Sequence, residues 1–161
     1  MKVIGLNHER MRFEPAMILD VGCGSKPRGD VNLDLGPTVL ARDSGKHTRA
    51  NIYASSTMLP FRDDSFSIVH FVGLLHHIKN PLVAWREMVR VCSGIIVGEE
   101  PSKFNIHAYL DKYHAFHGFS KRQMIRLCRD PRLMEYRVLY YFNRLDRVNL
   151  HITAIKKHVH A

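Results

Sequence analysis

The sequence contains no long apolar run and no apolar leader. None of its 161 residues lies in a segment that approaches the roughly 18 consecutive apolar residues of a membrane-spanning helix. Residues 1–15 carry charges throughout and lack the apolar core of a secretory signal. We therefore expect a cytoplasmic protein with no membrane segment.

Cysteine is also scarce. Cys23, Cys92 and Cys128 are far apart, odd in number and without the spacing of metal ligands, which argues against a disulfide framework. Reduced thiols are the simplest interpretation. His114 and His117 have a spacing that suits two metal ligands, but no nearby carboxylate or cysteine completes a recognisable zinc set. We expect no metal site.

Acidic residues are outnumbered by basic ones. The chain has 24 Lys and Arg against 15 Asp and Glu, for a formal net charge of +9. Residues 1–81 hold ten basic and eight acidic residues, whereas residues 82–161 hold fourteen and seven. A basic surface attracts anionic partners such as nucleic acid, although a charge excess alone does not establish one.

The first apolar run ends at Asp20 and Val21. A glycine-rich turn that contains Gly22 and Gly24 follows it directly. Glycine is used where the backbone takes an unusual φ or approaches a ligand closely. A second short apolar run ends at Asp34, whose carboxylate suits a ribose because it can accept hydrogen bonds from both hydroxyls. The P-loop lysine and the third glycine of dinucleotide-binding turns are absent.

Two sequence blocks together resemble the class I S-adenosylmethionine-dependent methyltransferases. The first is Asp-Val-Gly-Cys-Gly-Ser at positions 20–25. The second runs over residues 59–69 and continues through Leu-His-His-Ile at 75–78 and Asn-Pro at 80–81, similar to the branch that acts on small molecules. The resemblance covers roughly residues 16–128, and it implies methyl transfer with S-adenosyl-L-methionine as the cofactor.

The resemblance also implies a cofactor site. Asp20 and the glycine turn would shape the methionine end, and Asp34 would bind the ribose. A serine after the third strand would hold the adenine amino group where the family often has an acid, and the end of the fourth strand would border the methionine. The expected cofactor-binding residues are Asp20, Gly22, Cys23, Gly24, Asp34, Leu35, Ser55, Ser56, Val72 and Gly73.

The candidate catalytic residues are His76, His77 and Glu99. The two histidines follow the fourth strand, where either one can orient or deprotonate a substrate, since imidazole titrates near neutrality. A packing role fits them equally well. Glu99 and Glu100 end the fifth strand. One of them can act as a base or bind a substrate amine, and an equally good interpretation is that both are simply solvated acids.

The expected fold class is α/β: a Rossmann-like, doubly wound mixed sheet, mostly parallel, with a C-terminal antiparallel β-hairpin, in a single domain over residues 1–161. Only fourteen positions separate Asp20 from Asp34, and residues 25–30 include proline and glycine, so the first crossover helix is predicted to be missing or truncated. Residues 66–72 predict a strand buried on both faces, with His70 as a hydrogen-bonded core histidine. Residues 62–65 predict a solvated turn, residues 102–118 a substrate-side loop and residues 156–161 a frayed tail.

Two functional classes remain open at this point. One is an enzyme that methylates an unidentified acceptor, either a small molecule or an anionic macromolecule. The other is a catalytically silent module of the same fold that binds nucleic acid or another anionic partner through its basic second half, where a helix over residues 121–129 carries Lys121, Arg122, Arg126 and Arg129 outward. A homodimer that covers the pocket is a further expectation.

Overall fold

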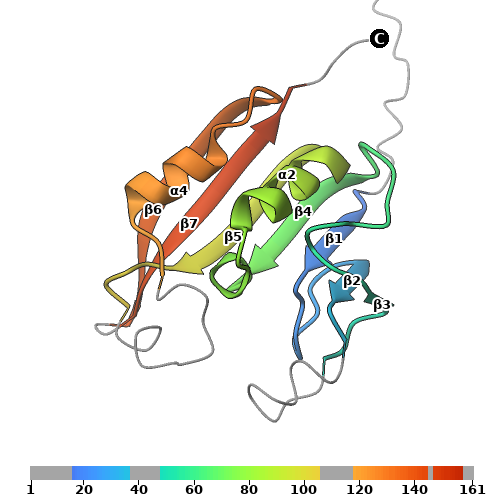
Figure 1. Cartoon of the computed structure of the whole chain (residues 1–161), viewed down its shortest axis with the longest axis horizontal. Helices are drawn as coiled ribbons and strands as arrows, with labels where there is room; N and C mark the ends of the chain where they lie inside the picture. Colours follow the sequence, from blue (N-terminus) through green and yellow to red (C-terminus); the bar gives the residue numbers. More distant parts are fainter. Residues whose placement is uncertain (1–15, 37–47, 106–117, 145–146, 158–161) are drawn as a thin grey trace, which may run out of the picture.

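Seven strands form one mixed sheet in the computed structural model of the chain, which describes residues 16–36, 48–105, 118–144 and 147–157 (Figure 1). Strands β1 to β5 run parallel, and β7 pairs antiparallel with both β5 and β6. The order across the sheet is β3-β2-β1-β4-β5-β7-β6. The elements are β1 (Ile18–Val21), β2 (Val31–Asp34), β3 (Ile52–Tyr53), β4 (Phe66–Val72), η1 (Leu75–His77), α2 (Pro81–Val91), β5 (Cys92–Pro101), α4 (Lys121–Cys128), β6 (Leu133–Arg144) and β7 (Arg147–Lys156). The expected fold class and C-terminal hairpin are confirmed.

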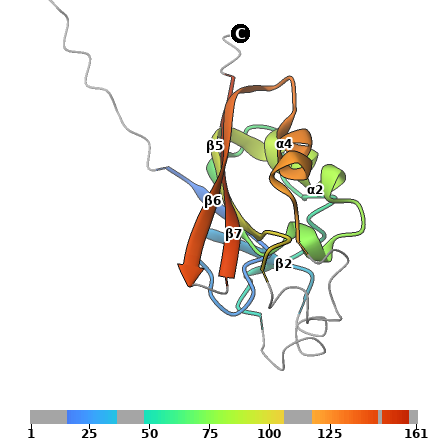
Figure 2. The same cartoon turned by 90° about the vertical axis from the view of Figure 1, so that its left-hand side faces the viewer.

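Helices α2 and α4 cover one face of the sheet (Figure 2). Cross-strand partners share a face, so Val69, Ile96 and Ala154 form one row beneath the helices, and each is fully buried. Trp85 of α2 is fully buried and packs edge-on against Phe71 of β4. The main core therefore lies between the helices and this face. None of the described helices is both long and apolar enough to cross a membrane.

The opposite face has no helix over it in the described part of the chain. A row of isoleucines in register crosses this face from β1 through β4 and β5 to β7: Ile18, Ile68, Ile95 and Ile155. Of these, Ile95 is 40 % exposed. The prediction that β4 is buried on both faces is therefore wrong, since alternate residues such as Ile68 are only partly buried. In the described residues, the β1–β2 connection contains no helix that could cover them.

A short loop replaces the first crossover helix, as the sequence predicted. Asp20 and Asn32 are register partners on β1 and β2, and both side chains bind the loop backbone. Asp20 Oδ2 accepts from Arg28 N at 2.9 Å, while the Asn32 amide exchanges two hydrogen bonds with the backbone of Gly29 at 2.9 and 2.8 Å. A Cβ on Gly29 would lie 2.8 Å from Asp20 N, so only glycine allows this close approach.

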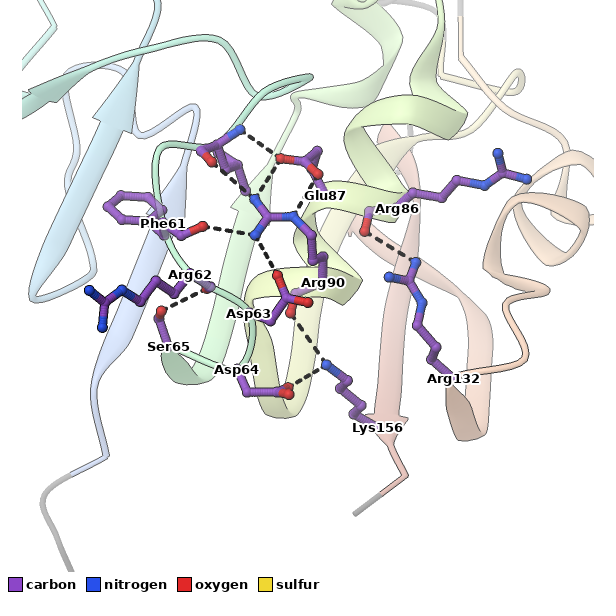
Figure 3. Close-up of polar contacts among 11 residues, drawn as sticks. Phe61, Arg62, Asp63, Asp64, Ser65, Arg86, Glu87, Arg90, Arg132 and Lys156 are labelled. Carbon is purple, nitrogen blue, oxygen red and sulfur yellow. Dashed lines mark hydrogen bonds and ion pairs between the residues drawn. The ribbon is translucent and has the colours of Figure 1, made fainter. Parts of the chain in front are cut away.

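Arg90, near the end of α2, joins several parts of the chain at the edge where the parallel strands begin (Figure 3). Its guanidinium donates to the carbonyls of Leu59 (3.0 Å) and Phe61 (2.8 Å), and to the carboxylates of Glu87 and Asp63 (2.8 Å each). These hydrogen bonds hold the pKa of both Glu87 and Asp63 below its usual range. The first part of the 59–69 motif is thus a structural element that fixes the entry into β4.

Lys156 extends the same network from the end of β7. Its ammonium group pairs with Asp64 and lies 3.3 Å from the carbonyl oxygen of Arg90 (Figure 3). Lys156 is only 9 % exposed, so the predicted frayed tail is wrong at its first residue. The predicted solvated turn over residues 62–65 is confirmed, since all four residues are exposed. The carboxylates of Asp63 and Asp64 nevertheless form ion pairs with Arg90 and Lys156, partners that the turn sequence did not predict.

Candidate active site

The glycine turn lies at the edge where the parallel strands end, beside the end of β2. Both Gly22 N and Cys23 N donate to the carbonyl oxygen of Leu33, at 2.7 and 3.2 Å. Gly22 and Gly24 have φ angles of 71° and 55°, in the left-handed region that L side chains rarely adopt. The turn therefore bends back over β2 and brings Gly24 to the last residue of that strand.

Asp34, that last residue, is tied to the turn. Its Oδ2 accepts from Gly24 N at 2.8 Å, and its Oδ1 accepts from Leu35 N at 2.7 Å. The Thr48 hydroxyl lies 3.4 Å from Oδ2 and 3.2 Å from the carbonyl oxygen of Gly24, and its single proton can go to only one of these oxygens at a time. A carboxylate offers about four acceptor positions, so Asp34 keeps at least about one for a ribose hydroxyl. Thr48 belongs to no recognisable motif, so the sequence analysis missed it.

The two glycines differ in what lies beside them. A Cβ on Gly24 would meet no atom of the described residues within 4 Å, whereas a Cβ on Gly22 would lie 2.7 Å from Cδ1 of Leu74. The bend is therefore filled on the Gly22 side by a leucine from the turn after β4. It is open on the Gly24 side, next to Asp34, where a ligand has room.

The Asp20 carboxylate is buried and bonded to other protein groups. It is 2 % exposed, and while Oδ2 binds the crossover loop, Oδ1 lies 2.9 Å from Nδ1 of His70. The expectation that His70 is hydrogen-bonded is confirmed. Both oxygens of Asp20 already have partners, so its place in the cofactor site stays a prediction, and its observed role is to hold the loop.

The other expected cofactor residues lie along the same edge. Ala54 N donates to the carbonyl oxygen of Asp34 at 2.9 Å, which places Ser55 and Ser56 beside it. The Ser55 hydroxyl is 2.7 Å from that of Thr57, so it is engaged locally, and Ser56 is 7 % exposed. Leu35, directly after Asp34, is 59 % exposed.

Val72 and Gly73 end β4, and Gly73 N donates to the carbonyl oxygen of Glu99 at 2.8 Å. Cys23 is buried within the turn, and burial raises the pKa of its thiol. A raised pKa disfavours the thiolate, so Cys23 is suited to packing in a tight turn rather than to nucleophilic chemistry.

Among the candidate catalytic residues, His76 and His77 lie in η1 and their ring centroids are 4.1 Å apart. His76 is 5 % exposed and its Nδ1 is 2.7 Å from Oε2 of Glu100, whereas His77 is exposed. Glu99 is a register partner of Val72 and His151, on the face opposite Glu100. The sequence predicted both acids at the end of β5, and the alternation of side chains along the strand brings Glu100 to His76.

The expected substrate-side loop, 102–118, falls mostly on residues 106–117, which lie outside the described residues. At its ends, Ser102 forms a β-bridge with Phe119, and Asn105 donates to the side-chain oxygen of Asn149 at 2.9 Å. His114 and His117 also lie outside the described residues. Elsewhere in the described chain, no group of three His, Cys, Asp or Glu side chains is arranged to hold a metal ion.

One family model matches about half of the chain. Residues 19–94 match the family model of a methyltransferase domain. Over this segment the chain is similar to a methyltransferase domain. The matched segment runs from β1 into β5 and includes the glycine turn, Asp34 and both histidines of η1. A comparison with curated proteins gives no match.

Solved methyltransferases share the fold. A SAM-dependent methyltransferase from Thermotoga maritima has 16 % identity and a TM-score of 0.61, covering 91 % of this chain and 84 % of its own. One from Methanosarcina mazei has 20 % identity and a TM-score of 0.56, covering 86 % and 91 %. One from Aquifex aeolicus has 15 % identity and a TM-score of 0.59, covering 88 % and 82 %.

The comparisons support S-adenosylmethionine as the cofactor. The site residues fit this group, because the Gly24 side of the bend is open and Asp34 keeps an acceptor position beside it. One common contribution is missing: no helix begins after the glycine turn, so no helix N-terminus faces the cofactor there. The site must rely on the bend, Asp34 and the ends of β3 and β4.

Proposed function

We propose that this protein transfers a methyl group from S-adenosylmethionine to an acceptor bound at the carboxyl edge of the sheet. The observation that carries the proposal is the hydrogen bond from Gly24 N to Asp34 Oδ2. It joins an open glycine bend to a carboxylate on the neighbouring strand, in a chain whose residues 19–94 match a methyltransferase domain. If the Asp34 carboxylate served only to hold the turn, the open space beside Gly24 would have no purpose.

The cofactor, when bound, supplies a methyl group already activated on a sulfonium, so the protein's work is to bind, orient and dehydrate the reactants. In our proposal Asp34 accepts a hydrogen bond from the ribose, and the bend from Gly22 to Gly24 lies against the methionine end. Ser55 or Ser56 approaches the adenine from the end of β3. His76 and His77 stand after β4, at the side from which an acceptor enters.

The acceptor is proposed to be either a small molecule or an anionic macromolecule. Arg122, Arg126 and Arg129 are exposed on or beside α4, which supports an anionic acceptor or partner. Lys121 lies with its ammonium group 5.9 Å from the ring centre of Tyr140, so it is held against β6. A homodimer that covers the site also remains a proposal.

Two measurements test the proposed function. Isothermal titration calorimetry with S-adenosylmethionine should give binding that Asp34→Ala abolishes while the variant stays folded by circular dichroism. Asp64→Asn is the matched control: it removes a carboxylate at the opposite edge, and asparagine tolerates the positive φ of 57° found there. Loss of binding in both variants, or unchanged affinity in Asp34→Ala, would contradict the ribose assignment.

Radiolabelled S-adenosylmethionine and separated nucleic acid, protein, lipid and metabolite fractions of a lysate should then show which fraction accepts the methyl group. Incorporation that depends on Asp34 supports an enzyme. Cofactor binding without incorporation into any fraction would instead favour the silent module.

A further inference from the structure

Glu100 is a buried carboxylate that accepts hydrogen bonds from the backbone at the start of η1. It stands next to the last residue of β5, its side chain is fully buried, and no lysine or arginine pairs with it among the described residues. Its Oε1 accepts from Leu74 N at 2.8 Å and from Leu75 N at 2.6 Å, and its Oε2 accepts from His76 N at 3.3 Å. Burial of a carboxylate is costly unless such donors satisfy it, so these backbone contacts hold the acid and the turn together.

The start of η1 has no cap of its own. The first N–H groups of a helix have no partner within the helix and need an acceptor from elsewhere. Leu74, the N-cap residue, makes no side-chain cap hydrogen bond, and the first turn contains no acidic residue. Glu100 supplies the acceptor from β5, where its pairing with Leu150 of β7 fixes its position. The backbone that carries Leu74 is therefore held by a residue 26 positions further along the chain.

The Leu74 side chain connects this turn to the glycine bend over residues 22–24. The three atoms nearest to a Cβ on Gly22 all belong to Leu74, at 2.7, 3.4 and 3.5 Å. The bend is also held by β2, since Gly22 N and Cys23 N both donate to the carbonyl oxygen of Leu33. It thus has two supports, the backbone of β2 and the Leu74 side chain, and the second depends on how Glu100 holds η1.

We propose that Glu100 is a positioning residue for the cofactor: it fixes the backbone of Leu74, and the Leu74 side chain holds the glycine bend in the shape that receives the methionine end. This rests on the proposed function and deepens it, because it makes affinity for S-adenosylmethionine depend on a fully buried acid. A site that is ordered before its ligand arrives loses less free energy to ordering on binding, so a released Leu74 weakens binding. The acid acts through Leu74 and makes no contact with the cofactor.

The first test is made on the wild-type protein, by NMR of leucine methyl groups during a titration with S-adenosylmethionine. The Leu74 signals are assigned by their loss in Leu74→Ala. We expect them to shift as the cofactor binds, because Leu74 contacts the bend. The signals of Leu133, which pairs with Lys156 at the opposite edge of the sheet, should not move. Leu74 signals that stay unchanged at saturation would overturn the proposal, and this test requires no Glu100 variant.

The second test is a double-mutant cycle read by calorimetry with S-adenosylmethionine. Glu100→Gln keeps the size of the side chain but replaces one acceptor oxygen with an amide NH₂ group that cannot accept. We expect this change to weaken binding about tenfold in the wild-type background and by less than about twofold in the Leu74→Ala background, since its effect passes through that side chain. Glu135→Gln, which removes an exposed carboxylate from β6, is the matched control and should leave the affinity unchanged in both.

A second variant covers the case in which Glu100→Gln does not fold, as judged by circular dichroism. Glu100→Asp keeps the charge but withdraws the carboxylate by the length of a methylene group, and we expect the same difference between the two backgrounds. Equal losses from Glu100→Asp in both would count against the proposal in the same way as for glutamine.

The outcomes separate this inference from the proposed function. Equal losses in both backgrounds mean that the acid supports the fold alone, and unchanged affinity in the single variant means that the bend does not need it. Either result overturns the inference while the wild-type protein still binds the cofactor. A wild-type protein that binds no S-adenosylmethionine contradicts the proposed function and the inference together.

Discussion

A Cβ on Gly22 would lie 2.7 Å from Cδ1 of Leu74, whereas the same atom on Gly24 would meet no neighbour within 4 Å in the part of the chain that the structure describes. The turn after β4 therefore packs directly on one glycine of the bend and leaves the other open. Since both glycines have a positive φ, an alanine at either position incurs similar backbone strain, and the two differ mainly in what the added methyl group contacts.

Gly22→Ala and Gly24→Ala should consequently differ in phenotype. Each should lose about 1–2 kcal/mol of unfolding free energy from left-handed strain. Gly22→Ala should lose more, because Leu74 must move. Gly24→Ala should weaken S-adenosylmethionine binding at least about tenfold, because its methyl group enters the open space beside Asp34. Urea unfolding and calorimetry measure the two effects. Wild-type affinity in folded Gly24→Ala would mean that the cofactor does not occupy this space.

Arg90→Ala should destabilise the fold without altering the site directly. The variant removes donors to two backbone carbonyls and two carboxylates at the edge opposite the cofactor. We expect a loss of about 2–3 kcal/mol in urea unfolding. Arg86→Ala, on the same helix with an exposed side chain, is the matched control and should change stability by less than about 0.5 kcal/mol. Equal losses in the two variants would show that the network contributes little.

Stability should fall at acidic pH through Glu87. The Arg90 guanidinium lowers the pKa of Glu87 in the folded chain. Its contribution is therefore fully present above the unfolded-state pKa and is lost as the pH falls through the lower folded-state pKa. We expect the unfolding free energy to decrease below about pH 4.5, and Glu87→Gln to flatten part of that decrease. Glu135→Gln, which removes a more exposed pair with Arg137, should leave the slope nearly unchanged.

Charge reversal on α4 tests the anionic partner. Arg122 and Arg126 are exposed, and replacing both with glutamate should weaken binding to nucleic acid in an electrophoretic mobility assay at low salt. Arg62→Glu, an exposed change outside α4, is the single-charge control. If the wild-type protein does not retard nucleic acid, the partner hypothesis is wrong. If Arg62→Glu has as large an effect, the interaction is not localised to α4.

The sequence was most informative where a local pattern decides local structure. The apolar run at Phe66–Val72 predicted β4 with its bounds, and the short interval from Asp20 to Asp34 predicted the missing helix. The helix expected over residues 121–129 is found at Lys121–Cys128, where the Ser120 hydroxyl accepts from Gln123 N and the Gln123 side chain binds back to Ser120 N. Each of these features depends on residues close together in the chain.

Contacts between distant segments could not be predicted in this way. Glu99 and Glu100 are adjacent in sequence, and only their alternation within β5 decides that Glu100 reaches His76. Thr48 reaches Asp34 from a segment without a motif. Both oxygens of Asp20, expected at the cofactor, bind protein groups instead, because a loop without a helix needs polar anchors on the sheet.

The position of β7 between β5 and β6 affects how the chain completes its fold during synthesis. β5 gains its second neighbour only when the segment ending at Lys156 arrives, and Asp64 meets its lysine partner 92 positions later in the chain. While this segment is still within the ribosome, the nascent chain exposes one long edge of β5 and leaves β6 without its partner strand. Any chaperone that engages this protein during synthesis would therefore find the β5 edge unprotected until β7 pairs with it.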